Sequence, residues 1–236
     1  MSSEPLKLTV KANTEDTVTA LLYSADRKNR LGVTLILGHG AGADQSSGFM
    51  KLFASGLSYR GFDVMTFNFV YTEQRRSAPD PKSKLESCFR AVIEAALGQK
   101  KLNGNRVVIG GKSMGGRIAS QVAAAACEQS DSFAKAIAGL VFLGYPLHPP
   151  GNPAKLRTEH LPQIKMPMLF VQGTRDSLGS TEEIASIIKK LKLPAEIYVI
   201  EGGDHSFKAP KKFGRSQEEV YEAAMDAILE WMKKFK

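Results

Sequence analysis

The feature that most constrains the fold is the alternation of apolar runs with segments of helical periodicity. The runs at 32–38, 106–110 and 139–143 are mostly apolar from end to end, which is typical of strands buried on both faces of a sheet. Between such runs, apolar residues recur every three or four positions, as in an amphipathic helix. The pattern predicts strands at 6–10, 17–23, 32–38, 63–67, 106–110, 139–143, 168–172 and 196–200, and helices at 47–60, 84–97, 114–127, 181–190 and 217–234.

This order predicts an α/β fold with a mostly parallel sheet and helices on both faces. We expect the first two strands to form an antiparallel edge, and we expect residues 1–236 to form a single domain, because no linker or repeat divides the chain. The longest irregular stretch, 144–166, is rich in proline and too short for a large lid domain. Since ligands gather at the carboxyl ends of parallel strands, functional residues are expected there.

The strongest local motif is Gly-Lys-Ser-Met-Gly at 111–115. It fits the G-x-S-x-G pattern of a nucleophile elbow, because it directly follows a predicted strand and opens a predicted helix. The glycines allow a sharp turn that would project the hydroxyl of Ser113 above the sheet. A phosphate-binding P-loop is disfavoured, since that motif requires glycine where this chain has Arg106, and a loop between strand and motif. Ser113 is therefore predicted to be a nucleophile.

An acid and a base follow Ser113 in the order that this kind of site requires, Ser, then Asp, then His. Asp176 follows the predicted strand at 168–172, and His205 follows the one at 196–200. We expect His205 to accept the serine proton and Asp176 to orient the imidazole. Asp204 is a competing acid, but its place next to His205 disfavours it. The other histidines, His39, His148 and His160, lie outside the required order.

The loop at 38–43, Gly-His-Gly-Ala-Gly-Ala, is expected to help bind an oxyanion. The N–H of Met114 would be one donor and that of Ala41 the other, with Gly42 as an alternative to Ala41. His39 is expected to order this loop. A dinucleotide-binding loop is disfavoured, because a polar stretch at 44–47 delays the helix and the acidic Asp63 stands at the start of the next strand.

Two loops are expected to border the substrate. The loop at 68–83 carries an arginine pair that could hold a carboxylate or phosphate, although a solvated loop or an ion pair with Glu73 is the simpler alternative. The second loop, at 144–166, could instead be a packed surface loop. The candidate substrate-binding residues are His39, Gly42, Arg75, Arg76, Tyr145 and His148.

Composition adds several exclusions. The net charge is +8, but the lysines lie without interleaved aromatic residues or a nucleic-acid motif, so we expect no nucleic-acid partner. The four histidines are scattered, so no metal site is predicted, and no cofactor is expected. The start of the chain is polar, and no apolar segment is long enough to span a membrane. A cytoplasmic protein without a membrane partner is therefore expected.

The whole set of motifs resembles a known family. LGHGAGA, GGKSMGGR, LGYPLHPPG, VQGTRD and GGDHSF occur here in an order and spacing similar to those of the α/β-hydrolase family of testis-expressed protein 30 and of the hydrolase-like part of NSL complex subunit 3. Small bacterial dienelactone-hydrolase-like proteins are also similar, but dienelactone hydrolases use a cysteine nucleophile where this chain has Ser113. The resemblance implies an α/β-hydrolase fold with little or no lid domain.

Together, the residues and the resemblance predict a serine hydrolase of the carboxylesterase or thioesterase type. It would cleave a small ester-like substrate through an acyl-enzyme. The family that the chain resembles also contains subunits of assemblies, and a fold does not by itself imply catalysis. The alternative is therefore a catalytically weak or inactive hydrolase-fold subunit with a protein partner.

Overall fold

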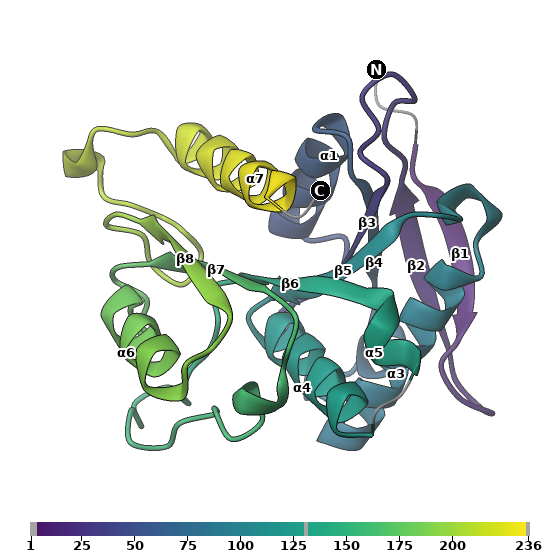
Figure 1. The fold of residues 1–236 in the computed structure, drawn as a ribbon, viewed down its shortest axis with the longest axis horizontal. Helices are drawn as coiled ribbons and strands as arrows, with labels where there is room; N and C mark the ends of the chain where they lie inside the picture. Colours follow the sequence, from purple (N-terminus) through teal and green to yellow (C-terminus); the bar gives the residue numbers. More distant parts are fainter. Residues whose placement is uncertain (1–3, 130–131, 235–236) are drawn as a thin grey trace.

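The computed structural model of the protein describes residues 4–129 and 132–234. It has one sheet of eight strands, which runs across the centre of the molecule in Figure 1. The strands are β1 (Leu6–Lys11), β2 (Thr17–Tyr23), β3 (Val33–Gly38), β4 (Asp63–Phe67), β5 (Arg106–Lys112), β6 (Ile137–Leu143), β7 (Met168–Gly173) and β8 (Ala195–Ile200). All eight predicted strands are thus present.

The strand order is β1-β2-β4-β3-β5-β6-β7-β8. β1 pairs antiparallel with β2, and β2 pairs antiparallel with β4, while every later pair is parallel. The predicted mostly parallel sheet with an antiparallel edge is therefore confirmed. In this order β3 and β5 lie side by side, so the loop after β3 and the turn after β5 meet at one edge of the sheet.

Helices cover both faces of the sheet. In Figure 1, α1 and α7 lie above the sheet and α3, α4 and α6 below it. The helices are α1 (Gly48–Tyr59), α2 (Val70–Glu73), α3 (Lys82–Leu97), α4 (Met114–Glu128), α5 (Ser132–Ala136), α6 (Thr181–Leu191) and α7 (Gln217–Lys233), with 3₁₀ turns at Lys100–Leu102, Leu161–Gln163 and Lys211–Phe213. The sequence did not predict α2 and α5, because helices of four or five residues are too short to show a periodic pattern.

The core is divided by the sheet into two layers. Every residue of β3 is buried, and its side chains alternate between the two layers. Ile36 packs below the sheet with residues of α3 and α4, whereas Leu35 and Leu37 pack above it with residues of α1 and α7. This double burial explains why the central strands are apolar without interruption.

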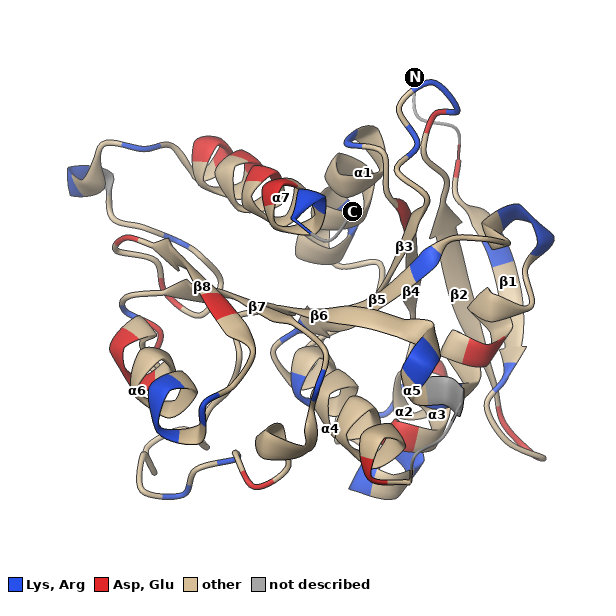
Figure 2. Ribbon diagram, in the orientation of Figure 1, with Lys and Arg blue, Asp and Glu red and all other residues tan. Residues whose placement is uncertain are grey.

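Most charged residues lie outside these layers, although Asp63, Asp80 and Asp176 are buried. Figure 2 shows Lys and Arg on helices and loops on both sides of the sheet, together with Asp and Glu. Some of the basic residues near the end of the chain are paired, as Lys233 is with Glu230 and Lys234 with Glu196. Within the ranges that the structure describes, none of the helices combines the length and the apolar character that crossing a membrane requires.

Candidate active site

Ser113 stands at a strained turn between β5 and α4. Its φ of 51° and ψ of −115° place it in a region that side chains other than glycine rarely adopt. The turn brings the backbone close to β3. A Cβ at Gly111 would lie 2.1 Å from the carbonyl oxygen of Gly38, and a Cβ at Gly115 would lie at the same distance from the same oxygen. Glycine is therefore required at both ends of the motif.

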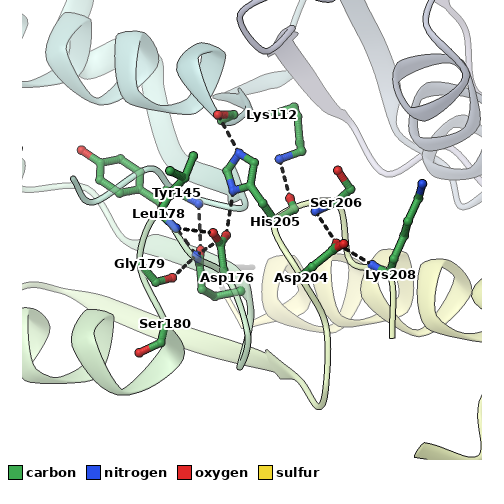
Figure 3. A network of polar contacts seen from close by, with 12 residues as sticks. Lys112, Tyr145, Asp176, Leu178, Gly179, Ser180, Asp204, His205, Ser206 and Lys208 are labelled. Atoms are coloured by element: carbon green, nitrogen blue, oxygen red, sulfur yellow. Dashed lines mark hydrogen bonds and ion pairs between the residues drawn. The ribbon is translucent and has the colours of Figure 1, made fainter. Parts of the chain in front are cut away.

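The three residues predicted to act together are in hydrogen-bonding contact. His205 Nε2 lies 2.8 Å from the hydroxyl oxygen of Ser113. On the other side of the ring, His205 Nδ1 lies 2.8 Å from Oδ2 of Asp176 (Figure 3). Because a carboxylate accepts hydrogen bonds, Nδ1 carries the proton and Nε2 is free to accept one from Ser113. The arrangement can thus withdraw a proton from the serine hydroxyl.

Asp176 is held as an acceptor by its neighbours. Its side chain is fully buried. Oδ1 accepts a bond of 2.9 Å from the N–H of Leu178, and Oδ2 accepts a bond of 2.8 Å from Nε2 of Gln172. The competing acid, Asp204, instead accepts the N–H groups of Ser206 and Lys208 in its own loop (Figure 3). Asp176 is therefore the acid that contacts His205.

The loops that carry Asp176 and His205 are bonded to each other. The N–H of Arg175 donates to the carbonyl oxygen of Gly203 at 2.9 Å, and the N–H of Gly202 donates to Oγ1 of Thr174 at 2.8 Å. The loops follow β7 and β8, which are adjacent parallel strands. The two side chains consequently meet although 29 positions separate them in the chain.

Lys112 also belongs to the site, and sequence analysis missed it. Its Nζ donates a hydrogen bond of 2.6 Å to the backbone carbonyl oxygen of His205 (Figure 3). The same nitrogen lies 5.8 Å from the ring centre of Phe49 and 5.9 Å from that of Phe207. Burial lowers the pKa of Lys112 to about 8, although Asp176 and Asp204 oppose this change. The available signal was a lysine next to Ser113, in the otherwise uncharged elbow.

The predicted oxyanion donors both border the space around Ser113. Ala41 and Met114 line a cavity together with Ser113. In the described part of the chain, neither residue's backbone N–H donates a hydrogen bond to a protein group. Two free N–H groups beside a serine hydroxyl are the feature that an oxyanion-binding site requires.

His39 and Gly42, two of the candidate substrate-binding residues, lie apart, and neither lines the two cavities that include Ser113. His39 is fully buried: its Nε2 accepts the N–H of Phe69 at 3.2 Å, and its Nδ1 lies 2.8 Å from the carbonyl oxygen of Gly40. Burial lowers the pKa of His39, which favours the neutral ring. His39 therefore orders the loop after β3 without reaching the cavities at Ser113, and Gly42 borders a separate hollow beside Arg75.

The remaining substrate-binding candidates do not line either of the two cavities that include Ser113. Arg75 and Arg76 border the separate hollow, and Arg76 is paired with Asp80. Tyr145 is buried between Phe142 and Phe170, and His148 is buried with Nε2 3.4 Å from Glu183. The prolines of their loop, Pro146 and Pro150, border one of the cavities instead. Tyr145 packs among aromatic rings, and His148 contacts Glu183 and the carbonyl oxygen of Pro149, so neither side chain lines a cavity at Ser113.

The described residues include no group of three or more His, Cys, Asp or Glu side chains that could hold a metal ion. The two cavities at Ser113 have volumes of about 560 and 360 Å³. The larger one is bordered by His205, Lys112 and Phe49, and the smaller one by Arg117 and Arg157. The site can thus receive a small organic molecule on both sides of the serine hydroxyl.

Solved structures share this architecture over nearly the whole chain. A serine hydrolase without a lid from Xanthomonas campestris is 16% identical, with a TM-score of 0.70 over 98% of this chain and 96% of that one. The dienelactone hydrolase of Anabaena variabilis is 18% identical, with a TM-score of 0.72 over 98% and 99%. Est1E of Butyrivibrio proteoclasticus, solved with ferulic acid bound, is 15% identical, with a TM-score of 0.70 over 96% and 99%. At these identities the likeness establishes the fold, which is the α/β-hydrolase fold with an eight-stranded sheet and little or no lid.

A family model described as an alpha/beta hydrolase domain matches residues 32–233. The match begins just before β3 and runs through α7, so it includes the elbow and the loops that carry Asp176 and His205. Since it covers most of the sequence, this chain belongs to the α/β-hydrolase family.

Proposed function

We propose that this protein is a serine hydrolase that cleaves a small ester-like substrate through an acyl-enzyme. The observation that carries the proposal is the continuous series of contacts from Asp176 through His205 to Ser113, with 2.8 Å at each step. Ser113 attacks the substrate carbonyl while His205 takes its proton, and Asp176 stabilises the resulting imidazolium. The N–H groups of Ala41 and Met114 bind the oxyanion.

His205 then returns its proton to the leaving oxygen, and the acyl group remains on Ser113. In the second half of the reaction a water gives a proton to His205 and attacks the acyl group, and His205 returns that proton to the oxygen of Ser113 as the acid leaves. The similarity of fold to Est1E, which was solved with ferulic acid, supports a small acyl compound as substrate. The sequence motifs given above support membership in the subgroup of testis-expressed protein 30.

The test uses a fluorophosphonate probe and p-nitrophenyl acetate on the purified protein. We expect covalent labelling and release of p-nitrophenol, and the loss of both in Ser113→Ala. Ser87→Ala, which changes an exposed serine on α3, is the matched control and should retain both. A folded wild-type protein that neither labels nor turns over would overturn the proposal and favour the alternative of an interaction subunit.

A further inference from the structure

The hydroxyl of Ser113 lies where two cavities meet. The larger, of about 560 Å³, is bordered by His205, Phe49 and Tyr221. The smaller, of about 360 Å³, is bordered by Met114 and Arg117. An ester bound at Ser113 has two parts, the acyl group and the leaving group, and the site has one space for each.

The position of His205 decides which part enters which cavity. His205 must protonate the leaving oxygen, so the leaving group lies on its side of Ser113. His205 borders only the larger of the two cavities. The acyl group therefore extends into the smaller cavity, whose lining determines which acids the site accepts.

Arg117 is an unusual group in the wall of the smaller cavity. Its Nε is buried without a hydrogen-bond partner. Oε1 of Gln121, one turn farther along α4, is likewise buried and unpaired, so the two groups do not satisfy each other. Burial lowers the pKa of Arg117 and the charge of Arg157 lowers it further, whereas Tyr145 and Glu86 oppose this change. A guanidinium N–H that is buried without an acceptor costs stability, and an anion beside Arg117 would remove that cost.

The other charged groups around this cavity leave it positive. Arg157, which is half-buried, and Lys82, which is exposed, also border it. The acid that borders it, Asp80, already accepts the guanidinium of Arg76 and the N–H of Tyr71. Arg76, one of the two arginines that sequence analysis named as candidates, is thus paired with Asp80, whereas no described carboxylate forms an ion pair with Arg117.

We propose that Arg117, assisted by Arg157, binds a carboxylate at the far end of the acyl group. A guanidinium can donate two parallel hydrogen bonds to a carboxylate, which gives both affinity and orientation. The substrate would then be a half-ester of a dicarboxylic acid, with its neutral alcohol in the larger cavity. This assignment rests on the proposed serine hydrolase function.

The test compares p-nitrophenyl half-esters of glutaric and adipic acid with neutral p-nitrophenyl esters of the same chain length. For wild type, kcat/KM should be higher for the charged ester. In Arg117→Gln the ratio of charged to neutral kcat/KM should fall by about 10- to 100-fold, which is the range expected for one hydrogen-bonded charge. Arg157→Gln should lower the ratio less. The matched control, Arg27→Gln, changes an exposed arginine and should keep the wild-type ratio.

The outcomes separate this assignment from the proposed function. If Arg117→Gln hydrolyses both kinds of ester in the wild-type ratio, the carboxylate site is wrong and the hydrolase function stands. If wild type hydrolyses neither ester, the hydrolase function fails, and binding then decides the assignment. In that case glutarate should raise the Tm of wild type but not of Arg117→Gln, and the absence of any rise would overturn the carboxylate site too.

Discussion

Replacing Lys112 by Met should stabilise the protein near neutral pH. Burial lowers the pKa of Lys112 from the ordinary 10.5 to about 8. In the unfolded chain the ammonium group returns to water and regains its ordinary pKa. At about 1.4 kcal/mol for each tenfold change in proton affinity, the difference disfavours folding by about 3 kcal/mol when the lysine is charged. Methionine has a similar length and carries no such cost.

The stability that Lys112→Met gains over wild type should disappear as the pH rises. Below pH 8 the lysine is protonated in both states, so the full cost applies. Between about pH 8 and 10.5 the folded protein has released the proton and the unfolded chain still holds it, so wild type gains stability relative to Lys112→Met. Lys112→Met also loses the contacts with Phe49, Phe207 and the carbonyl oxygen of His205. This loss changes the free energy of unfolding by a similar amount at every pH, so it adds little to the pH dependence.

Urea unfolding at several pH values measures this difference. The free energy of unfolding of Lys112→Met minus that of wild type should fall by about 3 kcal/mol from neutral pH to about pH 10.5. Lys189→Met, which replaces an exposed lysine on α6, is the matched control for the loss of one lysine. If the difference for Lys112→Met does not vary with pH, the reasoning from burial is refuted.

A group that costs stability in this position should contribute to function. Lys112 Nζ donates a hydrogen bond to the carbonyl oxygen of His205. This bond fixes the loop in which the imidazole of His205 contacts Ser113. We therefore expect kcat of Lys112→Met toward p-nitrophenyl acetate to fall by roughly tenfold, the size of one charged hydrogen bond. A more stable but slower variant would show that the buried Lys112 increases activity at a cost in stability.

Three further substitutions test the contact of Asp176 with His205 and the need for glycine in the elbow. Asp176→Asn should retain the fold but lower kcat by about 10³- to 10⁴-fold, because an amide no longer fixes the protonated Nδ1 of His205; steady-state kinetics would check this. Gly111→Ala should prevent stable folding, because its Cβ would lie 2.1 Å from the oxygen of Gly38, as circular dichroism would show. Gly104→Ala, which has a positive φ but nothing within 4 Å, should cost only about 1–2 kcal/mol.

The fold and the contacts of Ser113, Asp176 and His205 could be predicted because local chemistry decides them. Strands buried on both faces must be continuously apolar, and the elbow requires glycine beside the backbone of Gly38. Parallel strands carry their following loops to one edge of the sheet. The order of the motifs along the chain was therefore enough to bring these three residues together.

The substrate-binding residues could not be predicted in the same way. The sequence shows that Arg75 and Arg76 follow a strand, but not that Asp80 is paired with Arg76. It shows Tyr145 and His148 in a proline-rich loop, but not that both rings turn inward. Whether a charged or aromatic side chain faces solvent, a partner or a cavity depends on contacts from distant segments, and no local pattern records these.

The elbow itself links the chemistry to the choice of substrate. Its strained turn exposes the hydroxyl of Ser113, and it also sets the neighbouring side chains into the walls on either side. Lys112, just before the serine, borders the larger cavity, and Arg117, one helical turn after it, borders the smaller. The motif from 111 to 117 thus provides one cation beside each of the two cavities. Other hydrolases can share the glycines, which form the turn, and the serine, which carries the reacting hydroxyl. The turn itself does not require a charge at positions 112 and 117, so differences in specificity should arise there first.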